Sequence, residues 1–141
     1  MAAAIKAQVW IRCPRSGRVL LFKTQPARGG FWQPITGSAE KGETAEEAAI
    51  RETEEESGWR PHSVEPLGYR FQFTDRRGRE VAEEVFFADS HLEFEPTLDP
   101  KEHDAAEWVV LDEAAVRLTF DSNREALKRL VSRIRDGRGR A

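Results

Sequence analysis

The segment between Gly37 and Trp59 constrains the fold of this chain more than any other. It reads GSAEKGETAEEAAIRETEEESGW, a run rich in glutamate and alanine. On a helix with about 3.6 residues per turn, positions three and four apart share a face, so Glu52, Glu55 and Glu56 converge on one patch. Two such charges about 6 Å apart, at an effective dielectric constant of about 20, repel by roughly 3 kcal/mol. This acidic cluster therefore predicts a bound cation, and its oxygen-only ligands favour Mg²⁺ or Mn²⁺.

A second interpretation is that the acidic cluster is simply a solvated helical face, as most charge runs are. The position of the acids argues against it. A core-facing spacing of i, i+3, i+4 and i+7 places on one face Ala45, Ala48, Ala49 and Glu52, with Glu56 one turn further along. Carboxylates that continue a buried stripe are costly unless they are paired or bound to metal. The pattern thus favours a site.

Both ends of this helix are marked in the sequence. Thr44 and Glu47 have capping-box spacing, and Gly58 supplies a stop signal. These signals predict a helix from about Thr44 to Ser57. Gly37 is expected in the loop that precedes it, where glycine allows positive φ or a close approach of backbone to a ligand.

The same segment resembles a complete Nudix box, Gly-x5-Glu-x7-Arg-Glu-U-x-Glu-Glu-x-Gly-U, in which U is a bulky apolar residue. Thr53 departs from the pattern at the first U position, and Trp59 fills the second with a large ring. The fixed charged and glycine positions are all filled, by Gly37, Glu43, Arg51, Glu52, Glu55, Glu56 and Gly58.

The resemblance implies an α/β/α sandwich with a mixed β-sheet. It also implies that a metal-activated water hydrolyses a substrate in which a nucleoside diphosphate is linked to another group. Arg51 would orient the acidic side chains, and Glu43 would be the supporting acid of the box. The implied metal ligands are Gly37, through its carbonyl, and Glu52, Glu55 and Glu56.

Three further stretches are similar to the bacterial dihydroneopterin triphosphate pyrophosphatases. They are residues 31–38, which read FWQPITGS, residues 122–125, which read SNRE, and the pair Glu102-His103 followed by Trp108. This resemblance implies that dihydroneopterin triphosphate or a related nucleoside triphosphate is cleaved to the monophosphate and pyrophosphate. Glu102 would be an additional metal ligand or the general base, although its charged surroundings also suit a solvated loop.

Four residues are candidates for substrate binding, each with an ordinary structural alternative. Lys23 and Arg28 follow the second strand and could reach a phosphate, or be surface charges. Thr36 could bond to substrate or cap a turn. Trp32, beside Phe31, could stack on a pterin or purine, or belong to the core.

Two other functions compete with this interpretation. One is hydrolysis of a dinucleoside polyphosphate or a nucleotide sugar, with decapping of triphosphorylated RNA a more distant option. The other is a non-catalytic module that senses a nucleotide. A silent module is expected to lose metal ligands, whereas this box keeps them all, so the sequence favours catalysis.

Composition sets the remaining limits. With 141 residues the chain is expected to form one domain, and its one cysteine, Cys13, excludes an intrachain disulfide. It has no apolar leader and no run of eighteen apolar residues, so a cytoplasmic protein with no membrane partner is expected. Its net charge is −3, without the broad basic face of a nucleic-acid binder. Residues 137–141 are expected to be a flexible basic tail, and no pattern indicates an oligomeric state.

The rest of the chain predicts a mixed sheet and a closing helix. Alternation of Tyr69, Phe71 and Phe73 before a turn indicates a long hairpin whose aromatic residues are expected in the core. An amphipathic helix is expected to begin near Ser122. The predicted strands are residues 5–12, 19–23, 31–35, 67–74, 80–88 and 107–111.

Overall fold

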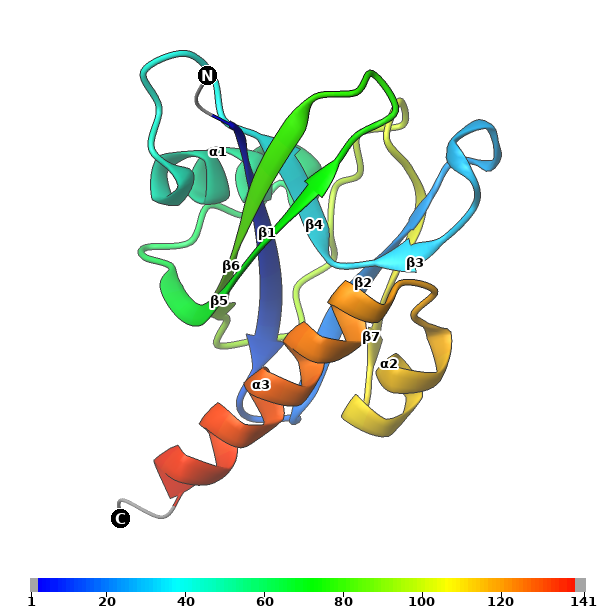
Figure 1. The fold of residues 1–141 in the computed structure, drawn as a ribbon. Coiled ribbons are helices and arrows are strands. Elements are labelled where there is room, and N and C mark those ends of the chain that lie inside the picture. The colour runs from blue at the N-terminus through cyan, green and yellow to red at the C-terminus, as the bar shows by residue number, and fades with distance from the viewer. Residues whose placement is uncertain (1–2, 139–141) are drawn as a thin grey trace.

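The computed structural model of the chain describes residues 3–138, which form a seven-stranded sheet with helices on both faces (Figure 1). The strands are β1 (Ala4–Cys13), β2 (Arg18–Thr24), β3 (Trp32–Gln33), β4 (Ile35–Ser38), β5 (Glu65–Thr74), β6 (Glu80–Asp89) and β7 (His103–Val109). The helices are α1 (Ala45–Ser57), α2 (Leu111–Arg117) and α3 (Asp121–Arg138), with a 3₁₀ turn, η1 (Pro26–Arg28).

The sheet is mixed because β1 runs parallel to β6 and antiparallel to its other neighbours. On its second edge β1 changes partner. Its first half, from Lys6 to Val9, pairs with β4, and its last residues, from Ile11 to Cys13, pair with β2. One edge of β1 is thus shared by two strands, β4 and β2.

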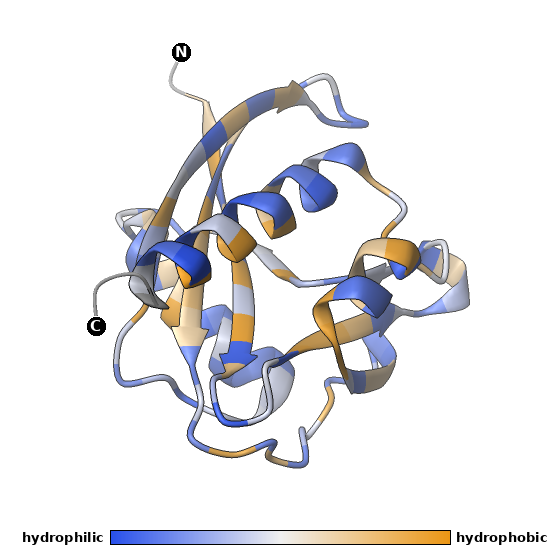
Figure 2. Cartoon of the chain, turned by 90° about the horizontal axis from the view of Figure 1, so that it is seen from below, coloured by the Kyte–Doolittle hydropathy of each residue, from blue (hydrophilic) through white to orange (hydrophobic). Residues whose placement is uncertain are grey.

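Each face of the sheet carries its own apolar core. On one face α1 covers a cluster that includes Ile11, Phe22 and Ile35. On the other face α2 and α3 cover a cluster that includes Trp10 and Leu130. Strands β1 and β6 are buried along most of their length and supply residues to both cores. Figure 2 shows apolar and polar residues mixed along the strands. The expected α/β/α sandwich is confirmed.

The expected ends of the first helix are also confirmed. The Thr44 hydroxyl accepts a hydrogen bond from the Glu47 backbone N–H at 3.1 Å, and the Glu47 carboxylate accepts one from the Thr44 N–H at 2.9 Å. Gly58 adopts the left-handed conformation, with φ of 79°, and its N–H closes the helix on the Glu54 carbonyl. The left-handed turn suits glycine because the residue has no Cβ.

Three expected elements differ from the structure. The short third strand is two strands, β3 and β4, because Pro34 has no N–H to continue the ladder. Gly37, expected in the loop before the helix, lies in β4. The last strand ends at Val109 and Leu111 begins α2, so the expected strand at residues 107–111 is placed too late.

The closing helix α3 begins at Asp121, one residue before the expected start at Ser122. Gly137 and Arg138, expected in a flexible tail, belong to α3, and residues 139–141 lie outside the described part of the chain. Within residues 3–138, no helix has the length and apolarity needed to cross a membrane.

Candidate active site

A cavity of about 820 Å³ lies beside the half of β1 that pairs with β4. Its wall is built by α1, the β5–β6 hairpin, β4, the segment before β7 and the first turn of α3. Glu52, Glu56 and Gly37 all line it, so the acidic cluster and the preceding glycine face the same space. Elements far apart in the sequence therefore supply one concave surface.

Glu52 is pressed against the backbone of β4 at Gly37. A Cβ atom placed on Gly37 would lie 2.2 Å from the Glu52 carboxyl carbon, which is far inside van der Waals contact. The φ of Gly37 is not positive, so glycine is needed here for close approach and not for an unusual turn. The Glu52 carboxylate and the β4 backbone therefore lie in close contact.

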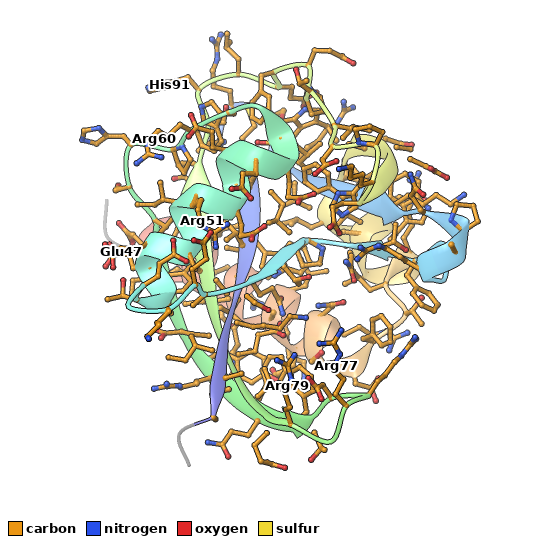
Figure 3. All side chains as sticks on the ribbon, turned by 90° about the horizontal axis from the view of Figure 1, so that it is seen from above. Glu47, Arg51, Arg60, Arg77, Arg79 and His91 are labelled. Atoms are coloured by element: carbon orange, nitrogen blue, oxygen red, sulfur yellow. The ribbon has the colours of Figure 1, made fainter. Side chains whose placement is uncertain are left out.

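Arg51 ties the acidic side chains to one another and to β4. Its guanidinium donates to both carboxylate oxygens of Glu43, at 2.8 and 2.9 Å. The same group donates to Glu52 at 3.0 Å, to Glu55 at 3.1 Å and to the Ser38 carbonyl at 3.0 Å. Figure 3 shows Arg51 on α1 beside the β4 segment. These charge-assisted bonds fix where the carboxylates lie.

Glu56 is buried, with only 5% of its surface exposed, and faces the equally buried His103 at the start of β7. Glu56 Oε2 lies 2.9 Å from His103 Nδ1, yet neither atom has a hydrogen bond of acceptable geometry. We treat the pair as a close contact and not as a formed hydrogen bond, because direction as well as distance decides a hydrogen bond. A buried carboxylate oxygen is thus left without a partner.

The pKa values of the carboxylates in this cluster are shifted in opposite directions. Burial, acting against the Arg51 hydrogen bond and charge, raises the pKa of Glu52 to about 7. The hydrogen bond from Arg51 holds the pKa of Glu43 down at about 2, and the pKa of Arg51 is raised above its usual value by the same bond to Glu43. Glu52 is the desolvated acid of the cluster, and its ionised form needs more positive charge than Arg51 provides.

The donor set fits a hard divalent ion. Glu52, Glu56 and the Gly37 backbone offer oxygen atoms at one end of the cavity, and one Glu56 oxygen has no partner. Across residues 3–138 no three His, Cys, Asp or Glu side chains are already gathered at metal-binding spacing. Glu52 and Glu55 instead point to Arg51, so binding an ion requires small rotations of these side chains.

Arg28 and Glu102 form an ion pair at the cavity wall. Arg28 Nη1 lies 3.0 Å from Glu102 Oε2, and both side chains are more than a third exposed. Thr36, on β4, also lines the cavity. Three residues that the sequence placed in separate segments are therefore brought to one space with the acidic cluster.

Lys23 and Trp32, two of the expected substrate contacts, do not line the cavity. Lys23 lies within β2, between β3 and β7. The Trp32 ring packs on the core under α2, with the Arg117 guanidinium 5.0 Å from its centroid. Phe31 takes the place at the cavity expected of Trp32. Adjacent residues of an extended segment point to opposite faces, so only one of the two aromatic rings can face the cavity.

Sequence reasoning missed several residues of the cavity. Phe73, expected in the core, lines it, and so do Lys6, Glu83 and Asn123. Tyr69 and Phe71 pack against the core, as expected, and Phe71 also lines the cavity. A signal for one of them was present: Glu83 interrupts the apolar face of Val81, Val85 and Phe87 on β6. A charged residue inside an alternating apolar face is unusual unless a partner or a ligand meets it.

Comparison with known proteins gives one family. The NUDIX domain family matches residues 5–130. A Myxococcus xanthus protein named octanoyltransferase is 44% identical over 120 residues, which are 82% of this chain and 32% of that protein. The chain thus spans about a third of the length of this relative. The dihydroneopterin triphosphate diphosphatase of Escherichia coli strain K12 is 30% identical over 118 residues, which are 72% of this chain and 75% of that protein.

A solved structure has the same fold. The E. coli dihydroneopterin triphosphate pyrophosphohydrolase superposes with a TM-score of 0.81 at 27% identity, and the match covers 92% of this chain and 95% of that chain. The overall fold therefore has a solved counterpart.

Proposed function

The chain belongs to the Nudix hydrolase family, and from this premise we propose that it cleaves dihydroneopterin triphosphate or a related nucleoside triphosphate to the monophosphate and pyrophosphate. One observation carries the proposal. Glu52, Glu56 and Gly37 line one cavity, a Glu56 oxygen has no hydrogen-bond partner, and Arg28 lines the same cavity. This arrangement places negative ligands for a cation next to positive charge for a phosphate chain.

The proposed metal ligands are Glu52, Glu55, Glu56 and the Gly37 carbonyl, with Glu102 as a further candidate. A divalent ion such as Mg²⁺ bound there would neutralise phosphate charge, lower the pKa of water and align the reacting groups. Arg51 would not touch substrate. It holds Glu52 and Glu55 in place through the hydrogen bonds described above.

The remaining residues have distinct proposed roles at the phosphates. Arg28 would bind a phosphate oxygen, and this would draw it away from Glu102, its partner at 3.0 Å. Glu102, once released, is a carboxylate free to accept a proton from the attacking water. The Thr36 hydroxyl would donate to the substrate from β4. Substrate binding and activation of the base would then be one event.

Two other functions compete with this proposal. Hydrolysis of dinucleoside polyphosphates or nucleotide sugars uses the same phosphate chemistry, so it differs only at the far end of the cavity. A non-catalytic sensor would have no need to keep the complete set of acids. Octanoyl transfer is not carried over, because that name belongs to a protein of which the matched segment is 32%.

The proposal is tested by measuring turnover of a substrate panel with Mg²⁺. The panel holds dihydroneopterin triphosphate, the common nucleoside triphosphates, a dinucleoside tetraphosphate and a nucleotide sugar. Running the reaction in ¹⁸O water and locating the label by mass spectrometry identifies the phosphorus attacked. We expect pyrophosphate release from a triphosphate. Faster turnover of the dinucleoside or the sugar would replace the proposal with the first competitor, and no turnover of any compound would favour the second.

A further inference from the structure

The apolar core beneath α3 ends in three buried polar residues. Gln8 on β1, Glu83 on β6 and Asn123 on α3 are 0%, 5% and 4% exposed, respectively. Each continues an inward-facing stripe: Gln8 precedes Trp10, Glu83 precedes Val85 and Phe87, and Asn123 precedes Ala126 and Leu127. We call Gln8, Glu83 and Asn123 the polar triplet. It lies at the end of the core where the cavity begins, and two of its members, Glu83 and Asn123, line the cavity.

The orientation of Gln8 is fixed by its neighbours. Trp10 Nε1 can only donate, and it donates to Gln8 Oε1 at 2.8 Å. The amide nitrogen of Gln8 must therefore point the other way, where it donates to Glu83 Oε2 at 2.7 Å. This chain of hydrogen bonds holds the Glu83 carboxylate in one position and satisfies one of its oxygens.

The second oxygen of Glu83 is the unusual feature. Among the residues that the structure describes, no group other than Gln8 donates to this carboxylate. Burial raises the pKa of Glu83, and the Gln8 hydrogen bond and the nearby charge of Lys6 lower it. A carboxylate buried with an unused acceptor is costly to the free protein, so a donor supplied by a ligand would be strongly favoured.

Asn123 offers a second unused acceptor in the same cavity. Its side-chain oxygen is buried and has no hydrogen-bond partner within residues 3–138. Orphaned buried polar atoms are rare in folded proteins, because each loses hydrogen bonds to water without replacement. Glu83 on β6 and Asn123 on α3 thus each bring an unused acceptor to residues that line the cavity.

Aromatic rings form the walls around these acceptors. Phe71 pairs directly with Glu83 across the β5–β6 ladder, and its ring stacks on Phe73 with 6.0 Å between centroids. Phe31 and Phe120, in edge-to-face contact at 5.1 Å, also line the cavity. Flat apolar walls with hydrogen-bonding groups at their edge suit a planar heterocycle.

We infer that Glu83 and Asn123 recognise the 2-amino-4-oxopyrimidine edge of the substrate ring, with Gln8 positioning Glu83. This inference rests on the proposed function and names the part of the substrate that these residues bind. The edge presents a ring N–H and an adjacent amino group, two neighbouring donors that match two acceptors. Guanine and pterin rings share it. Adenine presents one donor beside a ring acceptor, and hypoxanthine lacks the amino group.

The test measures ring binding without phosphates and without metal, so it is independent of hydrolysis. Affinities of guanosine, inosine, adenosine and 7,8-dihydroneopterin are measured by calorimetry in EDTA. We expect the wild type to bind guanosine about 10- to 100-fold more tightly than inosine, the range that one good bidentate base contact gives. Comparing the affinities for dihydroneopterin and guanosine shows which of the two rings the protein binds more tightly.

The variants separate recognition from folding. Glu83→Gln keeps size and shape, and Asn123→Leu removes an acceptor that has no partner in the free protein. We expect both to reduce the guanosine-to-inosine ratio towards one. Asn123→Leu should not lower the melting temperature, which a merely structural asparagine would do. The matched control is Glu84→Gln, the next residue of β6, which points to the opposite face and should leave the ratio unchanged.

Two results would overturn the inference: equal affinity of the wild type for guanosine and inosine, or a ratio unchanged in both Glu83→Gln and Asn123→Leu. Failure of the proposed function has a different signature. In that case the nucleosides would still bind with the expected selectivity, while no triphosphate would be hydrolysed in the presence of Mg²⁺.

Discussion

Glu52 should release a proton when a divalent ion binds. Its side chain is 14% exposed, and burial raises its pKa to about 7 although Arg51 donates to it. A carboxylate must be ionised to bind metal, so the ion and the proton compete for the same group. The perturbation to test is therefore pH, with Mg²⁺ or Mn²⁺ as the ligand.

The pKa sets the magnitude. With a pKa of about 7, binding at pH 7 should release about half a proton from Glu52, nearly one at pH 6 and about a tenth at pH 8. The apparent metal affinity should rise by up to about tenfold per pH unit below 7 and level off above it.

The same shift also affects stability. Because the folded pKa lies above the ordinary value of 4.5, the folded state holds the proton more tightly than the unfolded state between these values. The metal-free protein should therefore lose stability as the pH rises from about 4.5 to 7, by at most about 3 kcal/mol from this group. A bound divalent ion should restore it.

Calorimetric titration in two buffers of different ionisation enthalpy measures the proton count directly. Glu52→Gln should bind metal more weakly and abolish the pH-dependent release. Glu46→Gln, an exposed acid on the same helix, is the matched control and should behave as wild type. A proton count near zero at pH 6, or a metal affinity that is equal at pH 6 and pH 8, would refute the assignment of Glu52 as a desolvated ligand.

Three further predictions concern the acidic cluster and the residues beside it. Glu56→Gln should keep the far-UV circular dichroism spectrum and lower kcat by orders of magnitude, since it removes a proposed metal ligand; unchanged turnover would contradict that role. Gly37→Ala should weaken metal binding in calorimetry while leaving the melting temperature within a few degrees, because its Cβ would meet the flexible Glu52 side chain at 2.2 Å. Glu43→Gln should lower the free energy of unfolding in urea by about 1–2 kcal/mol at pH 7, after allowing for partial exposure. The pKa of Glu43 is lowered to about 2, so its ionised form stabilises the fold above pH 4.5, and the difference from wild type should shrink as the pH falls from 4.5 towards 2. A difference that stays constant over that range would exclude the Arg51–Glu43 pair as its source.

Local signals predicted α1 closely because they act within a few residues. The capping box and the left-handed Gly58 each depend on contacts between near neighbours, and the structure has both. The departure at Thr53 is also resolved locally: the side chain is fully buried, and its hydroxyl donates to the Ala49 carbonyl at 2.7 Å. A polar residue beneath the helix thus brings its own hydrogen-bond partner.

Alternation was less informative about which aromatic residues meet the cavity. The period of two correctly placed Phe71 and Phe73 on one face of β5, but it cannot distinguish a face that packs on a core from one that borders a cavity. That difference depends on where α3 begins beside the hairpin, since its first turn lines the cavity. For the same reason Trp32 was expected at the substrate, whereas α2 and Arg117 cover it.

The sequence by itself determined the acidic cluster, the helix that carries it and the alternation of the strands. Each depends on the spacing of residues within one segment, and the period of a helix or strand places regularly spaced residues on one face. Only the tertiary structure decided what those faces meet. The contact of Glu56 with His103, the approach of Glu52 to the β4 backbone and the position of Glu83 and Asn123 in the lining of one cavity all join segments that lie far apart along the chain. Spacing within a segment cannot encode such distances, since they arise only when strands and helices from distant parts of the chain pack together.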